Sequence, residues 1–143
     1  MRITAIIPAR NEQERIVATI EALGGGIPLD EIVVVSDGSA DATCTRARGA
    51  GAQVIELPGH LGKGAALEAG ASCTDADLYL LVDADLASSA SQMALVFEKM
   101  QEDALDLAIA SFPRPTGKVI PAVRISSYQR VNWSKSQHSC VMM

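Results

Sequence analysis

Apolar and polar positions alternate along the chain with two periodicities, one typical of buried strands and the other of amphipathic helices. Short runs of aliphatic and β-branched residues predict strands that are buried on both faces. Between them, apolar residues recur three or four positions apart, as Ile16, Ile20 and Leu23 do, which predicts helices with one buried face. The predicted strands are 3–7, 31–36, 53–57, 78–82 and 105–110, and the predicted helices are 12–23, 41–48, 63–72 and 88–101.

This order of elements predicts an α/β fold. Strands that alternate with helices are joined by crossover connections, which give a mostly parallel sheet with helices on both faces. Asn11 is expected to cap the first helix, with Glu12 and Glu14 at the positive end of its dipole. Ser39 or Asp41 is expected to cap the second helix.

Four polar or glycine-containing loops follow the predicted strands: PARNE at 8–12, SDGS at 36–39, GKG at 62–64 and DAD at 83–85. Each has an ordinary explanation as a helix start, a turn, a solvated lysine or a solvated loop. However, ligands of parallel sheets bind outside the carboxyl ends of the strands, where all four loops are expected. Their shared position favours a ligand site.

The DAD loop suggests the chemistry of that ligand. Asp83 and Asp85 directly follow an apolar run, and carboxylates beside a core are unfavourable unless positive charge meets them. A divalent cation that carries phosphates would supply such charge, because Mg²⁺ is commonly held by one or two carboxylates plus substrate phosphates. The alternative is that the two acids only begin a loop and cap the helix near Ser88.

Composition narrows the class of protein. The chain has 143 residues, 48% of them hydrophobic and 20% charged, which is typical of one globular domain. Its net charge of −5, without any Lys/Arg run, argues against nucleic-acid binding. No apolar run approaches the roughly 20 residues needed to span a bilayer, and no signal peptide is predicted. Three separated cysteines favour neither a disulfide framework nor a zinc site, so we expect a cytoplasmic location.

Two common nucleotide-binding motifs are not matched. The GHLGKG segment at 59–64 departs from the P-loop pattern, because Leu57 stands where a glycine is required and Gly64 where Ser or Thr is required. The loop after the first strand also lacks the glycines of a dinucleotide-binding turn.

Four segments together resemble family 2 glycosyltransferases of the GT-A fold: IIPARNE (6–12), VVVSDGSADAT (33–43), GKGAALEAG (62–70) and LLVDADL (80–86). They are most similar to the dolichyl-phosphate-mannose-synthase-like and glucosyl-phosphoglycerate-synthase-like branches. The resemblance covers about residues 2–112. It implies a Rossmann-like three-layer sandwich, of which this chain contains the nucleotide-binding half.

The resemblance also implies a function and a site. The function is inverting transfer of a sugar from a UDP- or GDP-sugar, with Mg²⁺ or Mn²⁺ as cofactor. Asp37 would accept a hydrogen bond from the base, Lys63 would lie near the base or phosphates, and Asp83 would hold the ribose and sugar. The full set implied to contact the nucleotide-sugar is Pro8, Ala9, Arg10, Glu12, Asp37, Lys63, Asp83 and Ala84, with Asp85 as the metal ligand.

The general base of such an enzyme is not found. It is usually an Asp or Glu in the acceptor half, yet no acid follows Lys118, and no helix or strand pattern is evident there. We therefore divide the chain into a nucleotide-sugar-binding part, 1–113, and an atypical tail, 114–143, expected from a truncated or frame-shifted product. The acceptor stays unknown, a lipid phosphate or a small molecule. The alternatives are a non-catalytic nucleotide-sugar-binding fragment and, less favoured because PARNE is not glycine-rich, a nucleotidyltransferase.

Overall fold

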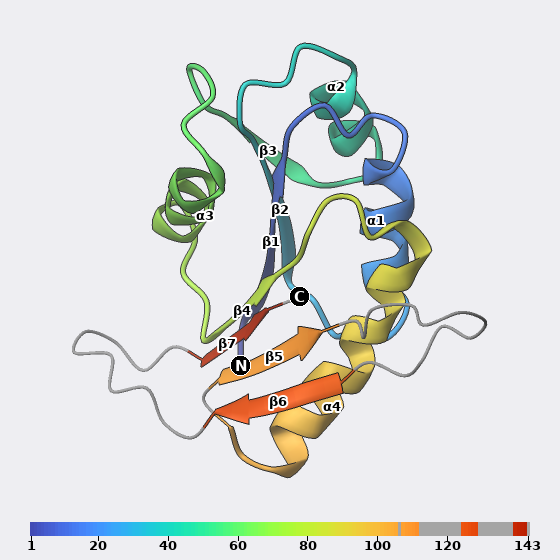
Figure 1. Cartoon of the computed structure of the whole chain (residues 1–143), viewed down its shortest axis with the longest axis vertical. Helices are drawn as coiled ribbons and strands as arrows, with labels where there is room; N and C mark the ends of the chain where they lie inside the picture. Colours follow the sequence, from blue (N-terminus) through green and yellow to red (C-terminus); the bar gives the residue numbers. More distant parts are fainter. Residues whose placement is uncertain (106, 112–123, 129–138, 143) are drawn as a thin grey trace.

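The computed structural model describes residues 1–105, 107–111, 124–128 and 139–142, which form one sheet with helices on both faces (Figure 1). The strands are β1 Ile3–Ala9, β2 Glu31–Ser36, β3 Gln53–Glu56, β4 Leu78–Leu81, β5 Leu107–Ser111, β6 Arg124–Tyr128 and β7 Ser139–Met142. The helices are α1 Ile16–Leu23, α2 Thr43–Gly49, α3 Lys63–Ser72 and α4 Met93–Glu102, and α4 is preceded by the 3₁₀ helix η1, Ala87–Gln92.

The sheet has the strand order β3-β2-β1-β4-β7-β5-β6. Every neighbouring pair is parallel except β5 and β6, which are antiparallel. The predicted α/β fold with a mostly parallel central sheet is therefore confirmed.

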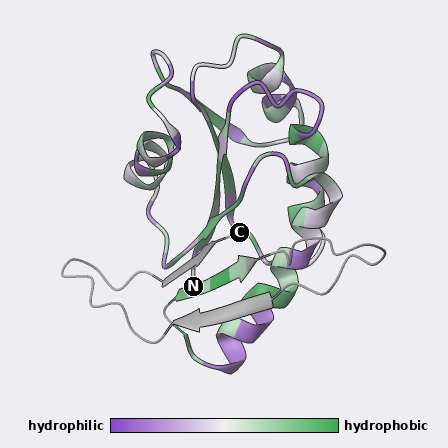
Figure 2. Ribbon diagram, in the orientation of Figure 1, coloured by the Kyte–Doolittle hydropathy of each residue, from purple (hydrophilic) through white to green (hydrophobic). Residues whose placement is uncertain are grey.

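The core lies in two layers, one on each face of the sheet. Alternate residues of the central strands point to opposite faces, as the period of a strand requires. Ile7 and Val34 pack with α1, α2 and α4, whereas Ile6, Val33 and Val35 pack under α3. Figure 2 shows hydrophobic central strands and a hydrophilic loop after β1. This is the predicted three-layer sandwich.

Strand β1 continues through Pro8, where the sequence predicted its end. Proline cannot donate to a strand ladder, so a central strand normally excludes it. Here the pairing of β1 with β4 ends at Ile6 and Leu81, and the Val82 N–H donates to the Ile6 carbonyl 3.0 Å away. Pro8 lies beyond this last pair, so its missing N–H removes no ladder bond to β4.

Asn11 does not cap α1, which corrects the prediction. Its φ is 54°, a left-handed conformation that asparagine tolerates better than most residues. Helix α1 begins at Ile16 with Arg15 at the cap position, so Glu12 and Glu14 lie outside its first turn. At α2 the cap position is Ala42, although the Asp41 carboxylate does accept the N–H of Thr43, 3.0 Å away.

The other differences concern the second half of the chain. The predicted helix 88–101 begins as the 3₁₀ helix η1 and becomes α-helical at Met93. Strands β6 and β7 lie where no element was predicted, and β7 pairs with both β4 and β5. Of the predicted tail, residues 114–123, 129–138 and 143 lie outside the described residues. No helix in the described part of the chain is long and apolar enough to cross a membrane.

Candidate functional site

The loops that the sequence singled out do meet at one edge of the sheet. The Asp37 N–H donates to the carbonyl of Ala9, 2.9 Å away, which joins the ends of β1 and β2. The Leu57 N–H donates to the carbonyl of Ser36, also at 2.9 Å, which brings the chain after β3 to the same edge. Helix α3 and the loop after β4 start from this edge as well (Figure 1). The shared position predicted from the parallel topology is confirmed.

The carboxylate of Asp37 binds the loop that precedes α3. Its side chain is only 7% exposed. It accepts the N–H groups of Leu61 at 2.6 Å and Gly62 at 3.0 Å, and lies 2.6 Å from Nδ1 of His60. Gly38 approaches the same loop so closely that a Cβ there would lie 2.9 Å from the backbone of Gly59. Residues 37 and 38 therefore fix the loop to the end of β2.

These contacts also determine the charge of Asp37. Burial alone would raise the pKa of its carboxyl group, but the hydrogen bonds from Leu61, His60 and Gly62 outweigh that effect and lower the pKa below 3.8. The group is thus ionised near neutral pH. His60, to which the sequence assigned no role, is part of this arrangement; no local pattern reveals it, because its partner lies 23 residues earlier.

Lys63 and Asp83 form an ion pair across the site. Lys63 is the first residue of α3, after Gly62, whose φ of 97° suits glycine. Asp83 follows β4. Their side chains are 60% and 40% exposed, so the pair is open to solvent and to a ligand. The two residues were predicted to share a site, and the structure brings them together.

Asp85 is exposed and has no hydrogen bond or ion pair to the described residues, so its carboxylate oxygens are available to a ligand. Within the described ranges, no group of three or more His, Cys, Asp or Glu side chains could hold a metal ion. A cation here would need further oxygen ligands from a substrate. That donor set fits Mg²⁺ or Mn²⁺, which accept hard oxygen ligands from one or two carboxylates and phosphates.

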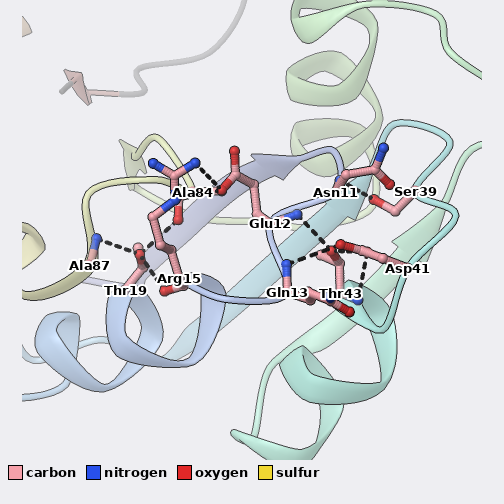
Figure 3. A network of polar contacts seen from close by, with 10 residues as sticks. All are labelled: Asn11, Glu12, Gln13, Arg15, Thr19, Ser39, Asp41, Thr43, Ala84 and Ala87. Atoms are coloured by element: carbon pink, nitrogen blue, oxygen red, sulfur yellow. Dashed lines mark hydrogen bonds and ion pairs between the residues drawn. The ribbon is translucent and has the colours of Figure 1, made fainter.

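The loop after β1 is braced against the loop after β2 by a polar network (Figure 3). The Asn11 side chain accepts the N–H of Ala40 at 2.8 Å, and the Glu12 N–H donates to the hydroxyl of Thr43, also at 2.8 Å. The Glu12 carboxylate pairs with Arg15 at 3.0 Å. The network fixes the backbone of the first loop.

The other predicted site residues differ in exposure. Pro8 is half-buried at the end of β1, Ala9 beside it is buried, and Ala84 is buried between the two aspartates. Arg10 is exposed, and none of the described residues bonds to it. Their contacts with a nucleotide-sugar stay a prediction.

The family model for glycosyl transferase family 2 matches residues 4–139. The chain belongs to this family. The family resemblance predicted from the four segments is therefore confirmed, and so is the GT-A fold, by the solved structures described next.

Individual relatives agree with this assignment. The family 2 chain is 38% identical to glucosyl-3-phosphoglycerate synthase of Mycolicibacterium smegmatis over 59% of its own length and 31% of the relative's. It is 36% identical to Protein RfbJ of Shigella flexneri, covering 75% of this chain and 82% of RfbJ. The crystal structure of glucosyl-3-phosphoglycerate synthase from Mycobacterium tuberculosis with Mn²⁺, UDP-glucose and phosphoglyceric acid superposes with a TM-score of 0.68 at 26% identity, over 80% of this chain and 45% of that one. The chain thus spans less than half the length of the synthases that it matches.

Proposed function

We propose that this chain is the donor-binding part of a glycosyltransferase that takes a UDP-sugar together with Mg²⁺ or Mn²⁺. The observation that carries the proposal is the juxtaposition, at the carboxyl edge of the sheet, of the Lys63–Asp83 pair and of Asp85, which has no partner among the described residues. Membership of glycosyl transferase family 2 supports it. So does the similar synthase structure, which holds Mn²⁺ and UDP-glucose.

Each polar group has a distinct role in this proposal. Asp85 holds the cation, and Lys63, which starts α3, contributes positive charge near the diphosphate, as does the helix dipole. Asp83 exchanges part of its ion pair for contacts with the ribose and sugar. The cation, when bound, acts as a Lewis acid that stabilises the charge developing on the diphosphate leaving group.

The base and ribose are assigned to the loop after β1 and to Asp37. Pro8, Ala9, Arg10 and Glu12 contact the base and ribose in this proposal. Hydrogen bonds of Asn11 and Glu12 already join their loop to the loop after β2. Asp37 already accepts hydrogen bonds from the loop before α3. We infer that Asp37 either positions this loop for contact with the base or accepts a hydrogen bond from the base while keeping its bonds to the loop.

Two classes of acceptor are candidates in this proposal. Similarity to a synthase solved with phosphoglyceric acid supports a small phosphorylated acceptor. The other candidate is a lipid phosphate. An inverting mechanism is part of the same proposal, and a GDP-sugar is the alternative donor. No general base is assigned among the described residues.

Calorimetric titration of the chain with UDP, with and without Mn²⁺, tests the donor site. We expect UDP to bind more tightly with Mn²⁺, and Asp85→Ala to remove that gain. The matched control is Asp75→Ala, which removes another exposed carboxylate, one that precedes β4 instead of following it. If Asp85→Ala bound UDP with the same Mn²⁺ dependence as the unaltered chain, the metal assignment would be wrong.

A titration with GDP and an assay of sugar transfer from a UDP-sugar separate the alternatives. Tighter binding of GDP than of UDP would transfer the proposal to a GDP-sugar. Metal-dependent UDP binding without sugar transfer to phosphoglyceric acid or to a polyprenyl phosphate would favour the non-catalytic nucleotide-sugar-binding fragment.

A further inference from the structure

One buried hydroxyl on α1 contacts the backbone on both sides of Asp85. Thr19 is fully buried. Its hydroxyl oxygen lies 2.8 Å from the carbonyl oxygen of Ala84 and accepts the N–H of Ala87 at 2.9 Å (Figure 3). The carbonyl of Arg15, in the turn that leads into α1, is a second possible acceptor at 3.1 Å. A hydroxyl carries a single hydrogen, so the shorter distance favours donation to Ala84.

The two backbone groups belong to the turn that presents Asp85. Ala84 is the residue before the aspartate, and Ala87 is two residues after it. Ala87 has a φ of 48°, which is unfavourable for a residue with a Cβ and persists only where the surroundings hold it. The bond from its N–H to Thr19 is one of the interactions that hold it.

Asp85 depends on such support in this arrangement. Its own side chain makes no hydrogen bond to the described residues, so nothing there fixes the carboxylate directly. The position of Asp85 relative to the rest of the site is consequently set by the backbone of the turn. Mutation of residues that orient a metal ligand typically lowers metal affinity by about 10–100-fold.

We propose that Thr19 is a positioning residue for the metal site: its hydroxyl holds the turn so that Asp85 faces the cation and the diphosphate. This inference rests on the proposed function. It adds a residue outside the four segments that carry the family resemblance, located on a helix that contributes no other side chain to the proposed site.

The test compares Thr19→Val, which keeps the shape of the side chain but removes the hydroxyl, with Thr19→Ser, which keeps the hydroxyl. The probe is UDP binding measured over a Mn²⁺ titration. We expect Thr19→Val to raise the Mn²⁺ concentration needed for half-maximal binding by about 10–100-fold, the usual effect of losing a group that orients a ligand. Thr19→Ser should restore most of the affinity, because a serine hydroxyl can make the same two bonds.

The chain offers a matched control in Thr4→Val. Thr4 is also fully buried, but its hydroxyl has no hydrogen-bond partner among the described residues. The same chemical change there should leave the Mn²⁺ requirement unaltered. A variant that merely unfolds in part binds fewer UDP molecules per chain but needs the same Mn²⁺ concentration, so stoichiometry separates folding from positioning.

Each remaining outcome is decisive. An unchanged Mn²⁺ requirement in Thr19→Val, while Asp85→Ala abolishes the dependence, overturns the role of Thr19 and leaves the proposed function intact. If Asp85→Ala also had no effect, the proposed metal site itself would be refuted. Should Thr19→Val not fold, Thr19→Ala also removes the hydroxyl, and an unaltered Mn²⁺ requirement in that variant counts against the proposal in the same way.

Discussion

Adding one methyl group at Gly70 should weaken the contact between α3 and the sheet. A Cβ at this position would lie 2.6 Å from Cγ2 of Ile6 and 3.1 Å from Cγ2 of Val35. Both atoms belong to β-branched side chains, which have few alternative rotamers. Both residues are fully buried in adjacent central strands, so neither can move aside without disturbing the core.

The size of the effect follows from two opposing contributions. Replacing a helical glycine by alanine stabilises a protein by about 0.4–1 kcal/mol when the site has room, because the unfolded chain loses freedom. Forcing an extra methyl group into a well-packed core costs about 1–3 kcal/mol. We therefore expect Gly70→Ala to lower the free energy of unfolding by about 1–2 kcal/mol.

Gly64→Ala is the matched control, since it lies in the same helix and a Cβ there would meet nothing within 4 Å. It should show only the favourable contribution, so the difference between the two variants isolates the packing cost of about 1–3 kcal/mol. Urea denaturation followed by circular dichroism measures both, and an unchanged m-value would confirm comparable unfolded states. Equal stability of the two variants would show that α3 does not approach β1 as closely as described. Helix α3 begins with Lys63, so the same measurement tests the packing of α3 on the sheet, which holds this lysine beside Asp83.

Two other stability predictions concern single side chains. The pKa of Asp37 is lower in the folded chain than its ordinary value of 3.8, so its contribution to stability is complete above that value and is lost as the pH falls through the lower folded pKa. Asp37→Asn should therefore destabilise the chain at neutral pH, with a difference that shrinks in acid, in denaturation measured over a pH series. Thr4→Val should keep or raise the stability, because it removes a buried hydroxyl that has no hydrogen-bond partner in the part of the chain that the structure describes. A loss of more than about 1 kcal/mol in urea denaturation would show that the hydroxyl is bonded after all.

The central strands could be predicted because strands buried on both faces consist of continuous runs of apolar residues. Residues 33–35 and 78–82 are continuous apolar runs. The first lies within β2, and the second forms β4 together with Val82, which directly follows it. Strand β7 was missed because it is short and enters the sheet out of sequence order, between β4 and β5. No local pattern encodes that insertion.

The cap assigned to Asn11 failed for a related reason. Asparagine before two acids and an apolar run is a typical helix start. Here the Asn11 side chain instead accepts the N–H of Ala40, 29 residues later, and the helix begins at Ile16. A local rule cannot anticipate a partner from another loop.

The same distinction separates the proposed ligands of the candidate site from the residue proposed to position them. Lys63 and Asp83 could be predicted to meet because they follow strands of one parallel sheet, whose topology brings those ends together. Thr19 could not, because in the sequence it reads as one more position on the buried face of a helix. Its hydroxyl lies 2.8 Å from the carbonyl of Ala84, a residue 65 positions later in the sequence. A buried hydroxyl with two backbone partners in a distant turn is costly to replace by an apolar group, since those partners would lose their bonds. The chain therefore has a physical reason to retain threonine at a position where helix periodicity alone would favour an aliphatic residue.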